Sequence, residues 1–153
     1  MTIETRIFGE VTIDNDKIIN FENGIIGFPD LTDFALIYDA EKGNDVGIRW
    51  MQSIQEPAFA MPVMDPLLVK EDYNPEVEDE LLKPLGGADP EQLLVLVTVT
   101  VPKDLTKMTV NLKGPMVINA DTKKACQIIV DDEYDVKYPV YEILNARKKV
   151  GEC

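Results

Sequence analysis

The sequence has no histidine and only one serine among its 153 residues. Without histidine, the usual general base for a serine or cysteine nucleophile is missing. Zinc sites built from cysteine and histidine are excluded for the same reason. The one serine, Ser53, lies inside a predicted strand, where its hydroxyl has a structural role. We therefore predict a protein that is not an enzyme and has no catalytic residues.

Cysteine is also scarce, because the sequence holds only Cys126 and Cys153. Two cysteines, one of them at the C-terminal end, do not form a disulfide framework. Cys126 is predicted to be a small core residue. No apolar run approaches the roughly 20 residues that span a bilayer, and the first residues lack the pattern of a signal peptide. We expect a cytoplasmic protein with no membrane contact.

Positive charge is in short supply, with 15 basic residues against 28 acidic ones and a formal net charge of -13. Such a surface repels phosphate backbones, so no direct nucleic-acid binding is expected. It suits a basic protein partner, although a plain solvated surface has the same composition. The acids at 14 and 16 and at 131–135 do not follow the spacing of an EF-hand calcium loop. No metal or cofactor is predicted.

Short β-branched segments separated by turn residues fill most of the chain, and this pattern is typical of an antiparallel β protein. The expected strands cover residues 2–8, 10–13, 17–21, 34–38, 47–54, 58–63, 92–101, 108–112, 116–120 and 125–130. We predict a mainly β fold, a small antiparallel β-barrel-like or sandwich domain with one to three short helices. Residues 1–153 are expected to form one domain, with a β-rich core over 1–140 and a short C-terminal helix or tail over 141–153.

Turn signals suggest how these strands pair. The first three segments are expected to form a meander, and the segments 108–112 and 116–120 a pair around Lys113, Gly114 and Pro115. The segment 92–101 is the longest and is predicted to lie at the centre of the sheet. Pro62 cannot donate a ladder hydrogen bond, so its strand is placed at an edge or ends there. Trp50 is expected in the core.

Two stretches predict helices. Asn74 and Pro75 suit the N-cap and first position of a helix that Pro84 would end, and a short strand over 73–77 is the alternative. Residues 141–150 hold helix-forming residues, with basic residues in the last turn.

Several separated stretches carry a recognisable pattern. They are Phe21-Glu22-Asn23-Gly24-Ile25-Ile26-Gly27-Phe28, Met51-Gln52-Ser53, Ala58-Phe59, Asp65-Pro66, Tyr73, Asn111-Leu112-Lys113-Gly114-Pro115-Met116-Val117-Ile118-Asn119, Gln127-Ile128-Ile129 and Tyr134. Together these stretches resemble the FliW family of flagellar assembly factors. Their order and spacing cover residues 3–138. Pro62 and Gly114 are minor departures from the family pattern.

The resemblance implies a small β-barrel-like fold and two protein partners. One is flagellin, bound in the cytoplasm before export. The other is CsrA, a small dimeric RNA-binding regulator that represses translation of flagellin mRNA. The factor is implied to bind CsrA and antagonise its repression until accumulating flagellin takes the factor away, which is feedback by partner switching.

Two kinds of segment are candidates for these contacts. The loop with Ile25, Ile26 and Phe28 offers apolar atoms, and its alternative is a loop packed on its own core. The acidic candidates could repel RNA beside a basic partner, and their alternative is solvated loops. These acids are Glu71, Asp72, Glu76, Glu78, Asp79, Glu80, Asp131, Asp132 and Glu133.

Two rival functions remain open at this point. A barrel of this size can hold one small ligand, or use carboxylates in catalysis, and a deep polar pocket inside it would favour that function. A general export chaperone without CsrA antagonism is the other rival.

Overall fold

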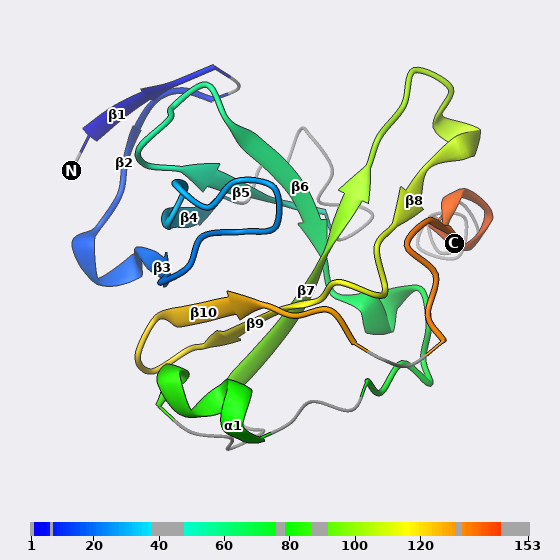
Figure 1. Cartoon of the computed structure of the whole chain (residues 1–153). Coiled ribbons are helices and arrows are strands. Elements are labelled where there is room, and N and C mark those ends of the chain that lie inside the picture. The colour runs from blue at the N-terminus through cyan, green and yellow to red at the C-terminus, as the bar shows by residue number, and fades with distance from the viewer. Residues whose placement is uncertain are drawn as a thin grey trace, which may run out of the picture.

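Strand β7 (Leu93–Thr100) crosses the middle of the computed structural model of the chain (Figure 1). The structure describes residues 2–6, 8–37, 48–75, 79–86, 92–130 and 133–144. With eight residues, β7 is long enough to pair with β6 along one edge and with β8 and β9 along the other. Its run of leucine, valine and threonine favours extended backbone. The expectation that 92–101 lies at the centre of the sheet is confirmed.

Seven strands close into a barrel through β7. Their order around the ring is β7, β6 (Ala60–Met64), β5 (Arg49–Ser53), β4 (Asp33–Ile37), β3 (Ile19–Phe21), β10 (Lys124–Gln127) and β9 (Met116–Asn119). The β7–β9 pairing closes the ring. The only parallel pairing among the described strands is that of β3 with β10. The mainly β, barrel-like fold predicted from the sequence is confirmed.

The predicted pairing of segments 108–112 and 116–120 with each other is wrong. Both β8 (Thr109–Val110) and β9 run along the same edge of β7, one after the other. The Asn111 N–H donates to Thr98 O, and Met116 lies opposite Leu96. The two-residue advance from Leu96 to Thr98 on β7 is therefore matched by a five-residue advance from Asn111 to Met116. The segment between β8 and β9 accordingly holds three extra residues, which form a bulge. The Asn111 side chain holds this bulge by accepting hydrogen bonds from the Lys113 and Gly114 amides. The far side of β8 pairs with β11 (Tyr138–Pro139).

The expected antiparallel meander is confirmed for its first two strands and wrong for the third. β1 (Thr2–Thr5) and β2 (Gly9–Thr12) form a separate two-stranded sheet. The 3₁₀-helix η1 (Asn15–Lys17) follows and directs the chain to β3, which pairs with β4 and β10. A turn signal at 14–16 predicts a change of direction but does not decide which strand is met next.

Pro62 lies within β6, an interior strand of the barrel between β5 and β7. Pairing with β7 begins only at Val63, whereas Pro62 is opposite Trp50 of β5. The missing N–H therefore costs no bond to β7, since that strand has not yet begun to pair. The expectation that this strand lies at an edge of the sheet is wrong, because β6 has a neighbour on each side. At Pro62 itself, however, only the β5 side is paired, as the expectation requires.

The helices of the described region are single turns. Besides η1 they are η3 (Pro66–Leu68), α1 (Asp79–Leu82), η4 (Lys83–Leu85) and η5 (Leu105–Lys107), and residues 141–144 are also helical. No helix in these parts is long and apolar enough to cross a membrane.

The helix expected to start at Asn74 and Pro75 is wrong in its boundaries. Residues 73–75 are neither helix nor strand, and the Asn74 N–H donates to the Tyr134 hydroxyl. Pro84 does not end the helix but lies inside η4, where a first-turn proline is tolerated because its nitrogen needs no partner. Residues 76–78 and 145–150 of the predicted helices lie outside the described residues.

The core has three parts. The barrel interior is filled by the first cluster, which includes Phe21, Phe34, Met51, Val63, Leu96 and Met116, all at most 1% exposed. A second cluster packs around the β8 end of β7, and a third lies under α1 and η4. Side chains of β7 alternate between these parts, which explains why both of its faces are apolar.

Two residues expected in the core are only partly buried. Trp50 is intermediate in exposure, and its ring centroid lies 5.9 Å from that of Phe8. Its Nε1 is buried and has no hydrogen-bond partner among the described residues. Cys126 is also intermediate. Ser53 is fully buried, and its Oγ accepts a hydrogen bond from the Glu56 N–H, which confirms its structural role.

We expect Phe34→Ala to lower the free energy of unfolding by about 3–5 kcal/mol, because it leaves a cavity in the filled barrel interior. The matched control is Ile26→Ala, which truncates a side chain that is 53% exposed and should change stability by less than about 0.5 kcal/mol. Urea denaturation followed by tryptophan fluorescence measures both. Equal losses for the two variants would contradict the assignment of the barrel interior as the main core.

Candidate functional site

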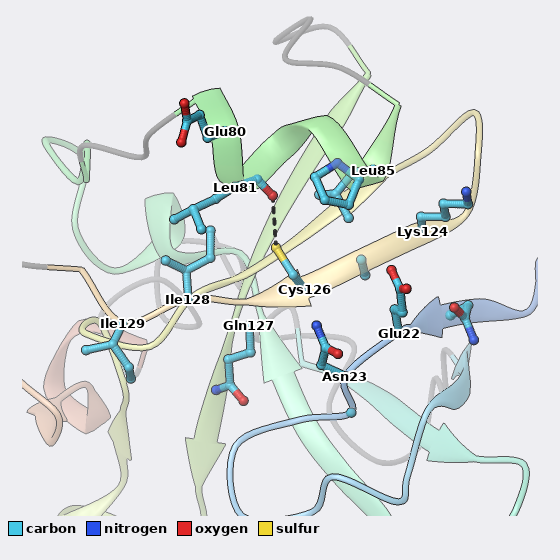
Figure 2. Close-up of a pocket in the computed structure, with 14 residues that line it drawn as sticks. Glu22, Asn23, Glu80, Leu81, Leu85, Lys124, Cys126, Gln127, Ile128 and Ile129 are labelled. Carbon is cyan, nitrogen blue, oxygen red and sulfur yellow. Dashed lines mark hydrogen bonds between the residues drawn. The ribbon is translucent and has the colours of Figure 1, made fainter.

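A groove of about 760 Å³ lies on the outside of the barrel, between β10, the α1–η4 turn and the chain that leaves β3. Figure 2 shows α1 and η4 on one side of it, β10 along its floor, and Glu22 and Asn23 on the other side. Its lining consists of Asn20, Glu22, Asn23, Gly24, Glu80, Leu81, Pro84, Leu85, Lys124, Ala125, Cys126, Gln127, Ile128 and Ile129. These residues are far apart in the sequence, so the fold creates the groove.

The groove opens where β3 turns away from β10. The two strands pair only at Lys124 with Asn20 and at Ala125 with Phe21. After Phe21 the chain enters a tight turn that requires Gly24. Its φ is +71°, and an added Cβ would lie 2.6 Å from the Phe28 carbonyl oxygen. Among the strands that the structure describes, none pairs with the remainder of β10 on that side.

The loop from Gly24 to Phe28 borders this opening. Ile25 is 4% exposed and packs into the barrel core, whereas Ile26 is 53% and Phe28 46% exposed. The Ile26 N–H donates to Gln127 Oε1 at 2.8 Å, which ties the loop to β10. Phe28 rests on the Phe59 ring at 4.9 Å. The structure thus separates the three apolar candidates, with Ile25 serving the core and the other two facing solvent.

The opposite wall is the α1–η4 turn. Leu82 and Leu85 are buried against the barrel, while Leu81 is 45% exposed beside the groove. The turn is fastened at its end by the Thr122 hydroxyl, which donates to Leu85 O at 2.6 Å. Cys126 Sγ lies 4.0 Å from Leu81 O (Figure 2). This wall therefore presents one large apolar side chain on a well-anchored base.

The groove offers little for catalysis. Burial raises the pKa of the Cys126 thiol, which keeps it protonated and a poor nucleophile at neutral pH. Within the described residues, no group of three or more cysteines and carboxylates is arranged to hold a metal ion. The groove lining mixes aliphatic side chains with polar ones, and its charged residues are Glu22, Glu80 and Lys124.

The acidic candidates are scattered. Glu71, Asp72, Glu80 and Glu133 are exposed, and Glu80 also lines the groove. Asp72 accepts a hydrogen bond from Lys70 at 3.1 Å, which lowers the pKa of Asp72 and raises that of Lys70. Asp79 begins α1. The remaining candidates, Glu76, Glu78, Asp131 and Asp132, lie outside the described residues.

Of the fourteen groove residues, only Glu80 was among the candidates chosen from the sequence, and Glu22, Leu81, Gln127 and Ile129 are four of those that were missed. Glu22, Gln127 and Ile129 belong to the stretches that carry the family resemblance, but their positions in the sequence do not show that they meet. Leu81 sits in a predicted helix, where an apolar residue is expected to be buried. The three-dimensional arrangement was needed to bring them together.

Comparison with known proteins agrees with this architecture. The family model described as FliW protein matches residues 2–140. The flagellar assembly factor FliW of Lachnoclostridium phytofermentans is 47% identical over 156 residues, covering 100% of both chains. That of Lachnospira eligens is 50% identical over 146 residues, covering 94% of this chain and 97% of the relative. A crystal structure of the flagellar assembly factor FliW superposes with a TM-score of 0.83 at 26% identity, covering 92% of this chain and 96% of that chain.

The similarity is not confined to one motif. It extends over the barrel, the α1–η4 turn and the loop that together form the groove, since all of them fall within residues 2–140. With a matching family model over this span and relatives of 47% and 50% identity over nearly their full length, the chain belongs to the FliW family of flagellar assembly factors.

Proposed function

We propose that this FliW-family chain binds flagellin in the cytoplasm and binds the translational regulator CsrA, antagonising its repression of flagellin mRNA. It acts by binding, with no catalysis and no cofactor, and residues 1–153 work as one domain. Accumulating flagellin takes the factor from CsrA, which is then free to repress translation. The relatives' shared name, flagellar assembly factor, supports a role in building the flagellum.

The observation that carries the proposal is the apolar rim of the groove. Leu81 lines the groove and Ile129 lies at one end of it, while Ile26 is bonded to its floor residue Gln127. These three aliphatic side chains are 45–56% exposed. Exposed large aliphatic side chains around one groove are typical of protein–protein contacts, because burial against a partner removes their apolar surface from water, which is favourable. We assign this rim to flagellin.

Negative charge supports the second half of the proposal. A regulator that binds RNA has to present basic surface to phosphates, and a neighbour of net charge -13 attracts that surface and repels RNA. The exposed Glu71, Glu80 and Glu133 contribute to this field. Antagonism by charge does not need to cover every RNA contact.

The filled barrel interior weighs against a small-ligand function. Phe21, Phe34 and Met51 occupy it with no exposed surface, and the groove lies outside the barrel. An export chaperone without a regulatory role differs from our proposal only in lacking CsrA binding. Measuring CsrA binding separates the two.

We expect Leu81→Gln to weaken binding of purified monomeric flagellin at least tenfold, mainly by faster dissociation, because it removes an apolar anchor from the groove. Titration calorimetry gives the affinity, and surface plasmon resonance gives the rates.

The matched control is Val101→Gln. Val101 is 47% exposed, close to the 45% of Leu81, but follows the end of β7 that pairs with β8 and is not a groove residue. It should bind flagellin within about twofold of the unchanged chain. Equal losses in both variants would show that general surface polarity, and not the groove, governs binding.

We expect reversal of Glu76, Glu78, Asp79 and Glu80 to lysine to slow association with CsrA, to weaken the salt dependence of association and to restore part of the RNA binding of CsrA. The reason is the net charge of -7 between residues 65 and 91, which comes from nine acids and two lysines. Stopped-flow mixing at low and at physiological salt measures the rates, since the Debye length falls to about 8 Å at physiological ionic strength.

A matched control reverses four other exposed acids, Glu4, Glu10, Asp14 and Asp16, on β1, β2 and the adjoining turn. This variant changes the net charge by the same amount at a different place. We expect a smaller effect on association. If the first variant binds CsrA and displaces RNA as the unchanged chain does at both salts, the stretch 76–80 has no part in the antagonism.

A further inference from the structure

The floor of the groove continues past the end of β10 into residues 128–130, which still bond to the chain that precedes β9 and offer an available backbone donor on their other side. The Ile128 N–H donates to Pro115 O at 2.9 Å and the Val130 N–H to Lys113 O at 3.0 Å, so both amides face the β9 side. Backbone groups alternate in direction along extended chain. The Ile129 N–H therefore faces the opposite side, toward the position that a longer β3 would occupy.

No described strand covers that side. Pairing of β3 with β10 ends at Phe21 and Ala125, and the turn at Gly24 carries the chain away. Among the residues that the structure describes, no hydrogen-bond partner is found for the Ile129 N–H, and Ile129 is 56% exposed. An unpaired edge of this kind is a template for another extended chain.

We propose that an extended segment of flagellin adds to this edge of β10 as an extra strand, in the place that β3 vacates. The inference rests on the proposed function in one respect, that flagellin is the protein that supplies the segment. Strand addition derives affinity from main-chain hydrogen bonds and specificity from the pockets beside alternate side chains. The groove beside β10 offers both.

The side chains around the Ile129 backbone indicate which residue types the added strand should have. On the α1 side an incoming chain meets Leu81 and Cys126, and on the other side it meets Gln127 and Ile129. Figure 2 shows Ile128 pointing toward Leu81, and Gln127 extending to the other side of β10. Successive side chains of an added strand point to opposite faces, so both faces of this strand contact aliphatic atoms. The segment is therefore a short run of apolar, β-forming residues.

The charged residues of the groove indicate which residues should flank the apolar run of the incoming segment. The charged residues that line the groove are Glu22, Glu80 and Lys124, so acids prevail there as they do in the whole chain. Glu22 and Asn23 lie across from β10, where the added strand has to enter (Figure 2). A lysine or arginine next to the apolar run complements Glu22. The occupant is thus a flagellin segment with an apolar extended run and an adjoining basic residue.

The decisive comparison is Ile129→Pro with Ile129→Ala. Both changes replace isoleucine by a smaller apolar residue, but only proline removes the N–H that an added strand needs. Proline breaks no described hydrogen bond here, since the Ile129 amide has no partner among the described residues. We expect the proline variant to bind flagellin about tenfold more weakly than the alanine variant, at equal thermal stability. Equal affinities would overturn the proposal.

Amide exchange in the unchanged chain provides a second measurement that does not depend on how the proline variant folds. Nuclear magnetic resonance should show the Ile129 amide exchanging rapidly in the free chain and at least tenfold more slowly in the flagellin complex. An Ile129 amide that exchanges equally fast in both would contradict strand addition, even if flagellin binds in the groove.

A synthetic peptide separates failure of this inference from failure of the proposed function. The probe is acetyl-Lys-Val-Ile-Val-Lys-amide, with the same peptide N-methylated at two successive central amides as its control. We expect the first to shift and protect the Ile129 amide and the second not to. If flagellin fails to bind the unchanged chain while the peptide pairs, the proposed partner is wrong and the strand edge stands. If neither peptide affects Ile129, the edge is no docking site.

Discussion

The pairing of β7 on both of its edges is the interaction on which the rest of the structure depends. Because β9 closes the ring against β7, the other barrel strands gain neighbours on both sides and the interior is sealed around Phe21, Phe34 and Met51. The three-residue bulge between β8 and β9 lets the two short strands share one edge of β7. Closure removes exposed strand edges, which otherwise invite uncontrolled association.

The groove lies beside one short pairing of the barrel, that between β3 and β10. β3 and β10 pair at only two positions, since the turn at Gly24 takes the chain away from the barrel wall. The space is bounded by the Gln127–Ile26 hydrogen bond on one side and by the anchored α1–η4 turn on the other. The same local feature thus exposes aliphatic side chains and backbone groups together, which is what recognition of an extended chain requires.

The two proposed partners are bound by different forces, flagellin by apolar contacts and CsrA by electrostatic attraction. Apolar contacts in a groove act at short range and govern how long a complex lasts, whereas a strongly acidic surface acts over about a Debye length and governs how fast a basic partner arrives. A chain of net charge -13 whose groove carries exposed aliphatic side chains can serve both needs at once. Under the proposed function, partner switching is a competition between two complexes held by different forces.

Composition and local pattern by themselves determined the β class, the central place of 92–101 and the structural role of Ser53, because these follow from residue chemistry and from spacing within one segment. The family was indicated by the resemblance of several separated stretches, in order, over residues 3–138. Only the tertiary structure decided that β3 meets β10, that β8 and β9 both lie on β7, and that Ile25 is buried while Ile26 is exposed. Leu81, Gln127 and Ile129 meet for the same reason. The strands pair in the order that closes one barrel and fills its interior with apolar side chains. The free energy gained in this way depends on residues that are distant in the sequence.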